Sequence, residues 1–289
     1  MVILTYKPDD RFIRLINMLD KQTVRPRRII IINTEEKYFR LPDRIKESIP
    51  GTEVHHITPG EFNHGGTRNF GAGLSGAEYL IFMTQDAVPS DGLLIEELLK
   101  PMDNEKVAVS YARQLPSEKA GEIERYNRSF NYPDRDLLKT EKDIDRLGIK
   151  TIFCSDVCAC YRRSVFDKLG GFVYTDFNED MIFAFHAVKA GYGIYYASKA
   201  AVIHSHEYTA LQQFKRNVVL GASQQKHPEV FKSFKSEGEG KKLVRGCTSY
   251  LMKKNKAYLI PVFYFHCAAR YAGFLTGKYL LPLFSKRNT

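Results

Sequence analysis

The sequence of 289 residues contains only five cysteines, and no two of them have the CxxC spacing of a metal or redox motif. The number is odd, which argues against a complete disulfide framework. We therefore expect reduced thiols in a cytosolic protein. The cysteines are Cys154, Cys158, Cys160, Cys247 and Cys267.

The sequence also has no low-complexity tract, no visible internal repeat and no segment typical of a secretory leader. Its first residues, MVILTYKPDD, have neither a basic region nor a long apolar stretch, so we expect a chain that stays in the cytoplasm. Hydrophobic residues make up 44% and charged residues 26% of the chain, which is typical of a globular protein with a sizeable core.

Acidic residues are in deficit, with 33 Asp and Glu against 43 Lys and Arg, and the formal net charge is +10. A basic chain favours an anionic partner, which can be a nucleic acid, a nucleotide-linked substrate or an acidic membrane surface. A nucleic-acid-binding protein typically has a basic stripe with exposed aromatic residues. Here the basic residues are spread along the chain, so we expect no nucleic-acid partner.

Apolar runs and amphipathic segments alternate over residues 1–112, which predicts a parallel α/β sheet. In such sheets ligands lie beyond the carboxyl ends of the strands, where Thr5, Asn33 and Asp86 are expected. We predict strands at 2–5, 27–33, 53–58, 79–84 and 106–111, and helices at 9–19, 66–77 and 91–100.

The pattern changes after residue 112. Residues 113–150 are polar and charged, which indicates an irregular excursion or a mobile lid. A second compact block starts at residue 151. In it we predict a helix in NEDMIFAFHAVKAGY, short strands at 193–197 and 200–204, and a helix at 207–225.

These patterns divide the chain into a domain of residues 1–225, with halves 1–112 and 113–225, and a C-terminal segment of residues 226–289. The segment contains the aromatic-rich run AYLIPVFYFHCAARYAGFLTGKYLLPLF, in which Arg270 lies near the middle. A membrane-spanning helix needs about 20 mostly uncharged residues. The run therefore favours an amphipathic helix lying at a membrane interface, with a core-closing helix or a dimer contact as the alternative.

A glycine pair in EFNHGGTRNFGAG comes just before a predicted helix. Gly65 permits close approach of a ligand to the backbone, and Arg68 follows in the first helical turn. A helix N-terminus and a guanidinium both suit a diphosphate. The alternative is an ordinary glycine-rich turn with a solvated arginine.

Two further motifs could hold a metal ion. In TQDAVP, Asp86 follows a strand and offers a carboxylate to a hard divalent cation, although one carboxylate alone cannot hold it. A polar residue capping the next helix is the alternative. In VIHSHEYT, His204 and His206 point the same way if they extend a strand, so both could approach a metal.

Glu179 and Asp180 lie at a loop-to-helix junction in DFNEDMIFAF. Their side chains diverge by about 100° on a helix, so at most one of them would point into a site. A carboxylate held there could act as general base on an alcohol. The alternative is favourable charge at a helix N-terminus.

The order of these motifs makes residues 1–225 resemble family 2 inverting glycosyltransferases of the GT-A fold, particularly the rhamnosyltransferase-like branch. The motifs are TY near the N-terminus, FNHGGTRNFGA, FMTQDAVP, CSDVCACYRRSVFDKLGGF, NEDM and VIHSHEYT followed by FKR. The resemblance implies an α/β fold with a Rossmann-like, mixed, mainly parallel sheet flanked by helices, here followed by a C-terminal amphipathic helical extension.

The resemblance also implies roles for the matching residues. Asp180 matches the catalytic base, with Glu179 supporting the geometry of the site. Asp86 matches the last aspartate of the DxD metal motif, and Thr84 replaces the first one. His204 matches a histidine that completes the coordination of Mg²⁺ or Mn²⁺, and His206 is a competing ligand.

For the donor, the resemblance implies that Thr5, Tyr6 and Arg68 contact the nucleotide diphosphate beside Gly65. Asn33 stands where many relatives carry an aspartate that binds the base. The QQFKR segment lacks the tryptophan of the QxxRW motif, so no processivity is inferred.

The implied reaction transfers L-rhamnose from dTDP-L-rhamnose to a lipid-linked saccharide in bacterial cell-surface polysaccharide synthesis. The enzyme would be peripheral on the cytoplasmic face of an anionic membrane, and a second copy of the chain stays open as a partner. The alternatives are a UDP- or GDP-linked donor and a sugar nucleotidyltransferase. The last would need a glycine-rich N-terminal loop with a lysine, which LTYKPDDRF does not provide.

Overall fold

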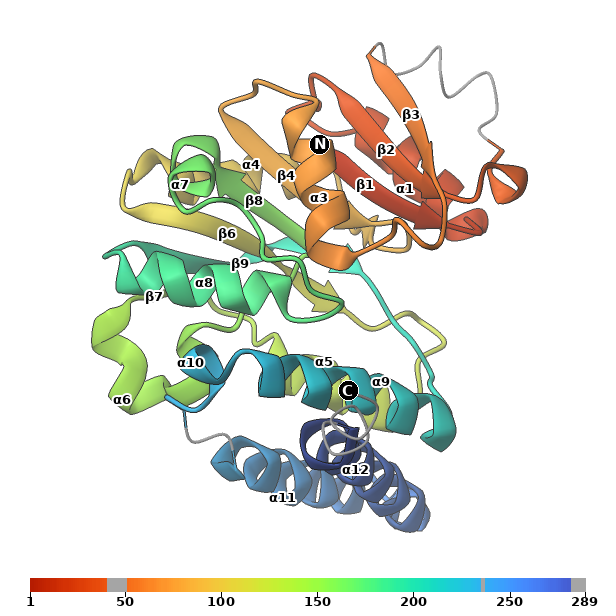
Figure 1. Cartoon of the computed structure of the whole chain (residues 1–289). Coiled ribbons are helices and arrows are strands. Elements are labelled where there is room, and N and C mark those ends of the chain that lie inside the picture. The colour runs from red at the N-terminus through yellow and green to blue at the C-terminus, as the bar shows by residue number, and fades with distance from the viewer. Residues whose placement is uncertain (41–50, 235–236, 282–289) are drawn as a thin grey trace.

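The computed structural model describes residues 1–40, 51–234 and 237–281, and in this part of the chain a single mixed sheet forms the centre of the molecule (Figure 1). The 9-stranded sheet has the order β3-β2-β1-β4-β8-β6-β9-β5, and β7 pairs with β9. The strands are β1 (Val2–Tyr6), β2 (Ile29–Thr34), β3 (Thr52–Ile57), β4 (Tyr79–Thr84), β5 (Val88–Pro89), β6 (Val107–Leu115), β7 (Leu137–Lys139), β8 (Cys158–Arg162) and β9 (Gly193–Ile203).

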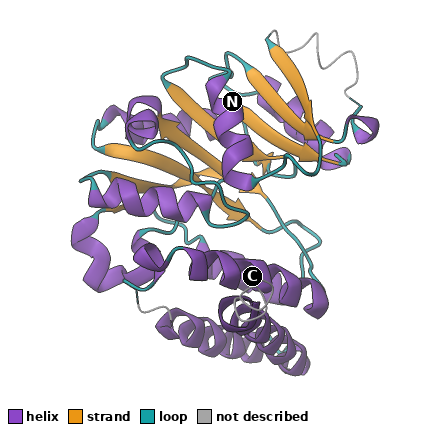
Figure 2. Ribbon diagram, in the orientation of Figure 1, coloured by secondary structure: helices purple, strands orange, loops and turns teal. Residues whose placement is uncertain are grey.

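Helices cover both faces of the sheet, and a further helical layer lies below it in the view of Figure 2. The helices are α1 (Asp10–Asp20), α3 (His64–Gly73), α4 (Leu94–Leu99), α5 (Glu122–Asn131), α6 (Ile144–Leu147), α7 (Arg163–Lys168), α8 (Glu179–Lys189), α9 (Ala210–Lys226), α10 (Pro228–Phe231), α11 (Glu237–Lys253) and α12 (Ile260–Leu275), and a π-helical turn (Thr276–Leu280) continues α12.

The N-terminal half follows the predicted alternation of strands and helices. β1 pairs in parallel with β2 and with β4, and β2 pairs in parallel with β3. All six residues of β2 are buried, as expected for a β-branched run covered on both faces. Asp9 caps α1 by accepting a hydrogen bond from the backbone of Arg11.

Strand β8 interrupts the parallel order, because it runs antiparallel between β4 and β6. Beyond it, β6 pairs in parallel with β9. The core divides into two clusters, one under α1 and α4 and one under α3, α7 and α8. In the second cluster the rings of Phe82 and Tyr161 meet edge to face at 5.4 Å.

Two predictions for the second half were wrong. Residues 113–150 are not an irregular lid: they contain α5, β7 and α6, and the polar helix α5 packs Ile123 and Tyr126 against α11 and α12. The two strands predicted at 193–197 and 200–204 are one strand, β9. A register shift between Ala112 and Arg113 of β6 lets β9 continue across the irregularity.

The C-terminal helix α12 packs along α9 at very short range. A Cβ atom added to Gly277 would lie 1.9 Å from the carbonyl oxygen of Val218, and one added to Gly273 would lie 2.3 Å from that of Phe214. On the other helix, Gly221 is equally close to the backbone of Phe274. The glycines therefore allow the two backbones to touch.

Within the described ranges, none of the helices has the length and apolarity needed to cross a membrane. The helix predicted in the tail is present as α12, and it contacts α9 rather than standing alone. The last part of the tail, residues 282–289, lies outside the described residues.

Candidate active site

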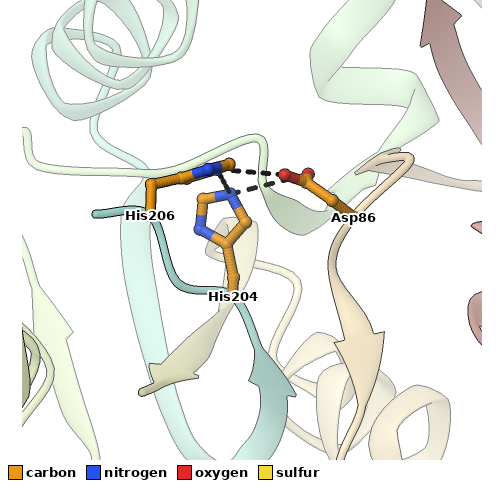
Figure 3. Close-up of side chains that lie close together, drawn as sticks. All are labelled: Asp86, His204 and His206. Atoms are coloured by element: carbon orange, nitrogen blue, oxygen red, sulfur yellow. Dashed lines mark hydrogen bonds and ion pairs between the residues drawn. The ribbon is translucent and has the colours of Figure 1, made fainter. Parts of the chain in front are cut away.

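Asp86 lies in the turn after β4, at the carboxyl end of the sheet, as predicted. Two residues later the chain enters β5, which pairs antiparallel with the end of β9, so that Val88 lies opposite Ile203. His204 follows directly. The short strand β5 thus brings the carboxylate and the two histidines together from segments far apart in the sequence (Figure 3).

The three side chains converge on one point. Nε2 of His206 lies 3.0 Å from Oδ2 of Asp86, and Nε2 of His204 lies 3.6 Å from Oδ1. The two Nε2 atoms are 3.0 Å apart. The potential ligand atoms all lie within 4.8 Å of one another, so both histidines reach the cluster rather than one of them.

This geometry suits a divalent cation. Ligand bonds of about 2.1 Å that meet at about 90° hold two donor atoms about 3.0 Å apart. One carboxylate with two imidazoles is a mixed oxygen and nitrogen set, which fits Mn²⁺ better than Mg²⁺, because Mg²⁺ prefers oxygen ligands and water. Asp86, His204 and His206 could therefore hold the metal.

The ionisation of these residues matches such a role. Burial by itself raises the pKa of Asp86, but His206 and His204 outweigh it and leave the pKa below its ordinary value. Burial lowers the pKa of His204 to about 3. At neutral pH the carboxylate is therefore charged and His204 is neutral, which is the state that binds metal.

Gln114, at the end of β6, sets the orientation of His204. Its Oε1 atom lies 2.9 Å from Nδ1 of His204, and its Nε2 donates to Ser155 at 2.9 Å. An amide oxygen can only accept, so Nδ1 of the histidine carries the proton and Nε2 is left free toward Asp86. Arg128 of α5 donates to the same oxygen.

Asp180 and Glu179 diverge, as predicted for neighbours at the start of α8. Asn178 before them adopts a left-handed conformation with φ of 65°, which Asn tolerates. Glu179 is buried, whereas Asp180 is partly exposed and accepts a hydrogen bond from the backbone of Asp156 at 3.2 Å. Burial, followed by the nearby carboxylates of Glu179 and Asp156, raises the pKa of Asp180 well above its ordinary value.

A path of contacts joins Asp180 to the cluster. The backbone N–H that binds Asp180 belongs to Asp156, its neighbour Ser155 binds Gln114, and Gln114 binds His204. On the other side of the same loop, Val157 accepts a hydrogen bond from the backbone of Thr84. The candidate base and the candidate metal ligands therefore share one supporting loop, residues 155–157.

Arg68 lies in the predicted helix, α3, but its side chain is buried rather than open to a ligand. Its side chain is 3% exposed and forms ion pairs with Glu179 at 3.0 Å and with Asp156 at 3.3 Å. These carboxylates occupy the guanidinium that we expected to bind a diphosphate. The glycine turn is also closed by the protein itself, because a Cβ on Gly65 would lie 1.9 Å from the carbonyl oxygen of Val173. Both residues are therefore buried against other parts of the protein.

The predicted donor contacts at the ends of β1 and β2 differ in exposure: two are buried and one is exposed. Thr5 and Asn33 lie opposite each other, are buried, and share a hydrogen bond of 3.0 Å. Tyr6 is 47% exposed, and Gln85 holds its backbone through two hydrogen bonds. Of these residues, only Tyr6 presents its side chain to the surface.

A cavity of about 310 Å³ opens next to His206, between α5, α9 and α12. The ring of Tyr208 stacks on His206 at 4.9 Å, and Arg216 lies 4.8 Å over Tyr208. Arg270 of α12 reaches the same cavity. The C-terminal helix therefore contributes a side chain beside the candidate metal ligands.

Sequence reasoning missed several of these residues. Gln114 lies in no predicted motif, although extending the predicted strand at 106–111 to its real end would have reached it. Asp156 lies in the motif CSDVCACYRRSVFDKLGGF, but the sequence assigned it no role. Arg11, in the first turn of α1, lies 3.5 Å from Asp86 and was read only as part of a helix.

The fold agrees with the comparisons to known proteins. The model of glycosyl transferase family 2 matches residues 1–170, and the chain belongs to that family of glycosyltransferases. The O-antigen chain rhamnosyltransferase RfbN of Salmonella typhimurium is 33% identical over 98% of this chain and 91% of its own length. WbaN of Salmonella anatum, with the same description, is 36% identical over 98% of this chain and 90% of its own length.

These relatives align with nearly the whole chain, so the similarity includes the C-terminal helices as well as residues 1–225. Solved structures share the GT-A fold at low sequence identity. A mannosyltransferase from Pyrobaculum calidifontis, solved with GDP-mannose and Mn²⁺, has a TM-score of 0.66 at 12% identity and covers 96% of this chain and 86% of its own. TarS of Staphylococcus aureus, residues 1–349 with UDP-GlcNAc, has a TM-score of 0.54 at 12% identity, covering 96% and 89%.

Proposed function

We propose that this enzyme transfers L-rhamnose from dTDP-L-rhamnose to a hydroxyl group of a lipid-linked saccharide during O-antigen synthesis. The observation that carries the proposal is the match to two O-antigen chain rhamnosyltransferases over 98% of the chain. The candidate site supports it, because a base and a metal cluster stand on one supporting loop.

In this proposal Asp180 takes the proton from the acceptor hydroxyl as that oxygen attacks the anomeric carbon. The attack comes from the face opposite the leaving diphosphate, so the configuration inverts and no covalent enzyme intermediate forms. The raised pKa of Asp180 makes its carboxylate a stronger base than an ordinary aspartate. Glu179 keeps Arg68 paired and thereby fixes the start of α8.

We assign Asp86, His204 and His206 to the divalent cation, with Mn²⁺ preferred over Mg²⁺. When bound, the ion neutralises charge on the departing diphosphate. Gln114 holds His204 in the tautomer that offers Nε2, and Tyr6 is the donor contact that is open to the surface. Thr5 and Asn33 support the nucleotide end of the site from beneath, with the hydroxyl of Thr5 bound to Asn33.

We further propose that α12 and the residues before it dock on the anionic cytoplasmic face of the membrane. Tyr258, Phe265 and Tyr271 are 68%, 66% and 65% exposed, and Lys253 and Lys254 are exposed nearby. Aromatic and basic side chains together suit the interface of an acidic bilayer. A second copy of the chain is the competing occupant of this surface.

A donor screen tests the proposal. The purified enzyme is incubated with Mn²⁺, a lipid-linked saccharide acceptor and, in turn, dTDP-rhamnose, UDP-linked and GDP-linked sugars, and the product is detected by mass spectrometry. We expect transfer from dTDP-rhamnose, with inverted configuration at the new linkage. Transfer from a UDP- or GDP-sugar alone would replace the assigned donor, and retention of configuration would remove the role of Asp180.

A further inference from the structure

The cavity beside His206 carries more positive charge than its own acidic residues can balance. Its walls include Arg128, Arg216 and Arg270 against one carboxylate, Glu124. Glu124 is already bound to Arg128, with Oε1 at 2.7 Å from Nε. The cavity therefore has no further carboxylate to pair with its other two arginines, Arg216 and Arg270.

Arg216 and Arg270 have no carboxylate within ion-pair distance among the side chains described in residues 1–40, 51–234 and 238–281. Arg270 donates one hydrogen bond, from Nε to Oε1 of Gln213 at 3.1 Å. Arg216 lies over the rings of Tyr208 and Phe177. A guanidinium has five N–H donors in a planar fork, so most of this capacity is available to a ligand.

Leaving Arg270 without an anionic partner costs free energy, because its side chain is partly buried. It is partly buried between α9 and α12, and burial lowers its pKa. A desolvated cation without a partner is unfavourable, and an anion that enters the cavity would remove that cost. A volume of about 310 Å³ is in the range of sites for small ligands.

We propose that Arg216 and Arg270 bind a phosphate or diphosphate group of the acceptor, and thereby select acceptors whose saccharide is carried on such a group. This inference rests on the proposed function. Two guanidinium groups match phosphate oxygens through paired N–H donors. The cavity adjoins the candidate metal ligands through His206, so the donor diphosphate is the competing occupant. The acceptor is favoured because Arg270 belongs to α12, which also carries the exposed aromatic residues Phe265 and Tyr271.

Helix α12 carries both the proposed phosphate-binding arginine and exposed aromatic residues that suit a lipid. One side of the helix carries Arg270 toward the cavity, while Phe265 and Tyr271 are 66% and 65% exposed. An acceptor held at Arg270 would have its phosphate in the cavity and its lipid beside the exposed aromatic residues. In this proposal α12 contacts both the phosphate and the lipid of the acceptor.

The test compares two acceptors with the same saccharide, one on a lipid diphosphate and one on a neutral alkyl glycoside. For Arg270→Gln we expect the KM of the diphosphate acceptor to rise about tenfold or more, the loss of one charge-assisted contact. The KM values of the neutral acceptor and of the donor should stay unchanged. Arg270→Lys should recover part of the effect, because it restores the charge.

Arg245→Gln is the matched control, since Arg245 is exposed on α11 of the same C-terminal segment and outside the cavity. It should leave all three KM values as in the wild type. An equal rise for both acceptors in Arg270→Gln would mean that the residue only supports the fold. A rise in the donor KM instead would assign the anion site to the donor diphosphate.

A binding experiment separates this inference from the reaction itself. Inorganic diphosphate is titrated into the full-length protein by calorimetry, with a chelator present so that no metal contributes. We expect binding in the wild type and in Arg245→Gln, and none in Arg270→Gln. Displacement by the lipid-diphosphate acceptor, and not by dTDP, would identify the source even if rhamnose transfer failed. Absence of binding in the wild type would overturn the inference even if transfer succeeded.

Discussion

Gln114 and His204 form a hydrogen bond of 2.9 Å between Oε1 and Nδ1, and this contact directs the other nitrogen of the histidine toward Asp86. Partners of this kind, one step removed from a metal, fix the tautomer and the ring orientation of a ligand. The pair therefore connects the end of β6 to the proposed metal centre.

Gln114→Leu should reduce the affinity for Mn²⁺ by about tenfold to a hundredfold, because His204 loses the acceptor that fixes its tautomer. Titration of Mn²⁺ followed by electron paramagnetic resonance measures the change. Gln114→Glu keeps an acceptor oxygen and should retain most of the affinity. Gln225→Leu, at an exposed position of α9, is the control. Wild-type affinity in Gln114→Leu would show that the contact does not act on the metal.

Asp180→Asn should lower kcat by about a hundredfold to ten-thousandfold, the usual contribution of a general base. The affinity for dTDP-rhamnose should stay within about twofold, since the residue is assigned to the acceptor. Steady-state kinetics and equilibrium donor binding give the two values. Asp145→Asn removes an exposed carboxylate on α6 and should change neither. Near-normal turnover of Asp180→Asn would exclude the residue as the base.

Arg68→Met should destabilise the protein by about 3–5 kcal/mol, because Asp156 and Glu179 would be left as buried carboxylates without their cation. Urea unfolding measures the loss. Arg146→Met breaks an exposed pair with Asp143 and should cost less than about 1 kcal/mol. If Arg68→Met lost as little free energy of unfolding as the control and also bound the donor more weakly, Arg68 would be assigned to the donor diphosphate instead.

Lys139 predicts a dependence of stability on pH. The side chain is 1% exposed, donates to the hydroxyl of Tyr111 at 3.0 Å, and burial lowers its pKa to about 7. Between about pH 7 and the ordinary lysine value, the unfolded chain holds a proton that the folded chain has lost. The free energy of unfolding should therefore rise with pH over this window, because the cost of removing the proton from Lys139 on folding is largest near pH 7 and disappears toward the ordinary lysine pKa.

Urea unfolding of the wild type and of Lys139→Met from pH 7 to 10 isolates that contribution as a difference between the two proteins. We expect the difference to change by a few kcal/mol, on the order set by a shift of about three pKa units. Lys199→Met, at an exposed position of β9, should show no such trend. Parallel curves for the wild type and Lys139→Met would contradict the depressed pKa.

The sequence predicted the part of the site that depends on strand order. Parallel strands end at one edge of a sheet, so Thr5 and Asn33 could be placed there from their position after apolar runs. Asp86 and His204 also follow strands, and their meeting was expected, but the short β5 that brings them together was not.

The arginine of the glycine turn shows why other residues could not be placed. A charged side chain in a first helical turn is compatible with a ligand or with an internal partner, and sequence spacing does not distinguish the two. The partners of Arg68 are Asp156 and Glu179, which come 88 and 111 positions later in the numbering of the chain. Only the folded chain brings the loop before β8 and the start of α8 next to this arginine of α3. The polarity of α5 was misleading for the same reason, since its apolar partners lie in α11 and α12.

The glycine contact between α9 and α12 changes how the C-terminal segment can be studied. Because the two backbones touch at Gly221, Gly273 and Gly277, removing α12 would also uncover α9, which carries Gln213 and Arg216 into the cavity. A truncated enzyme would lose the proposed acceptor contacts and the proposed membrane-docking surface at the same time. Single substitutions on the outer aromatic face are therefore the means of separating anchoring from catalysis.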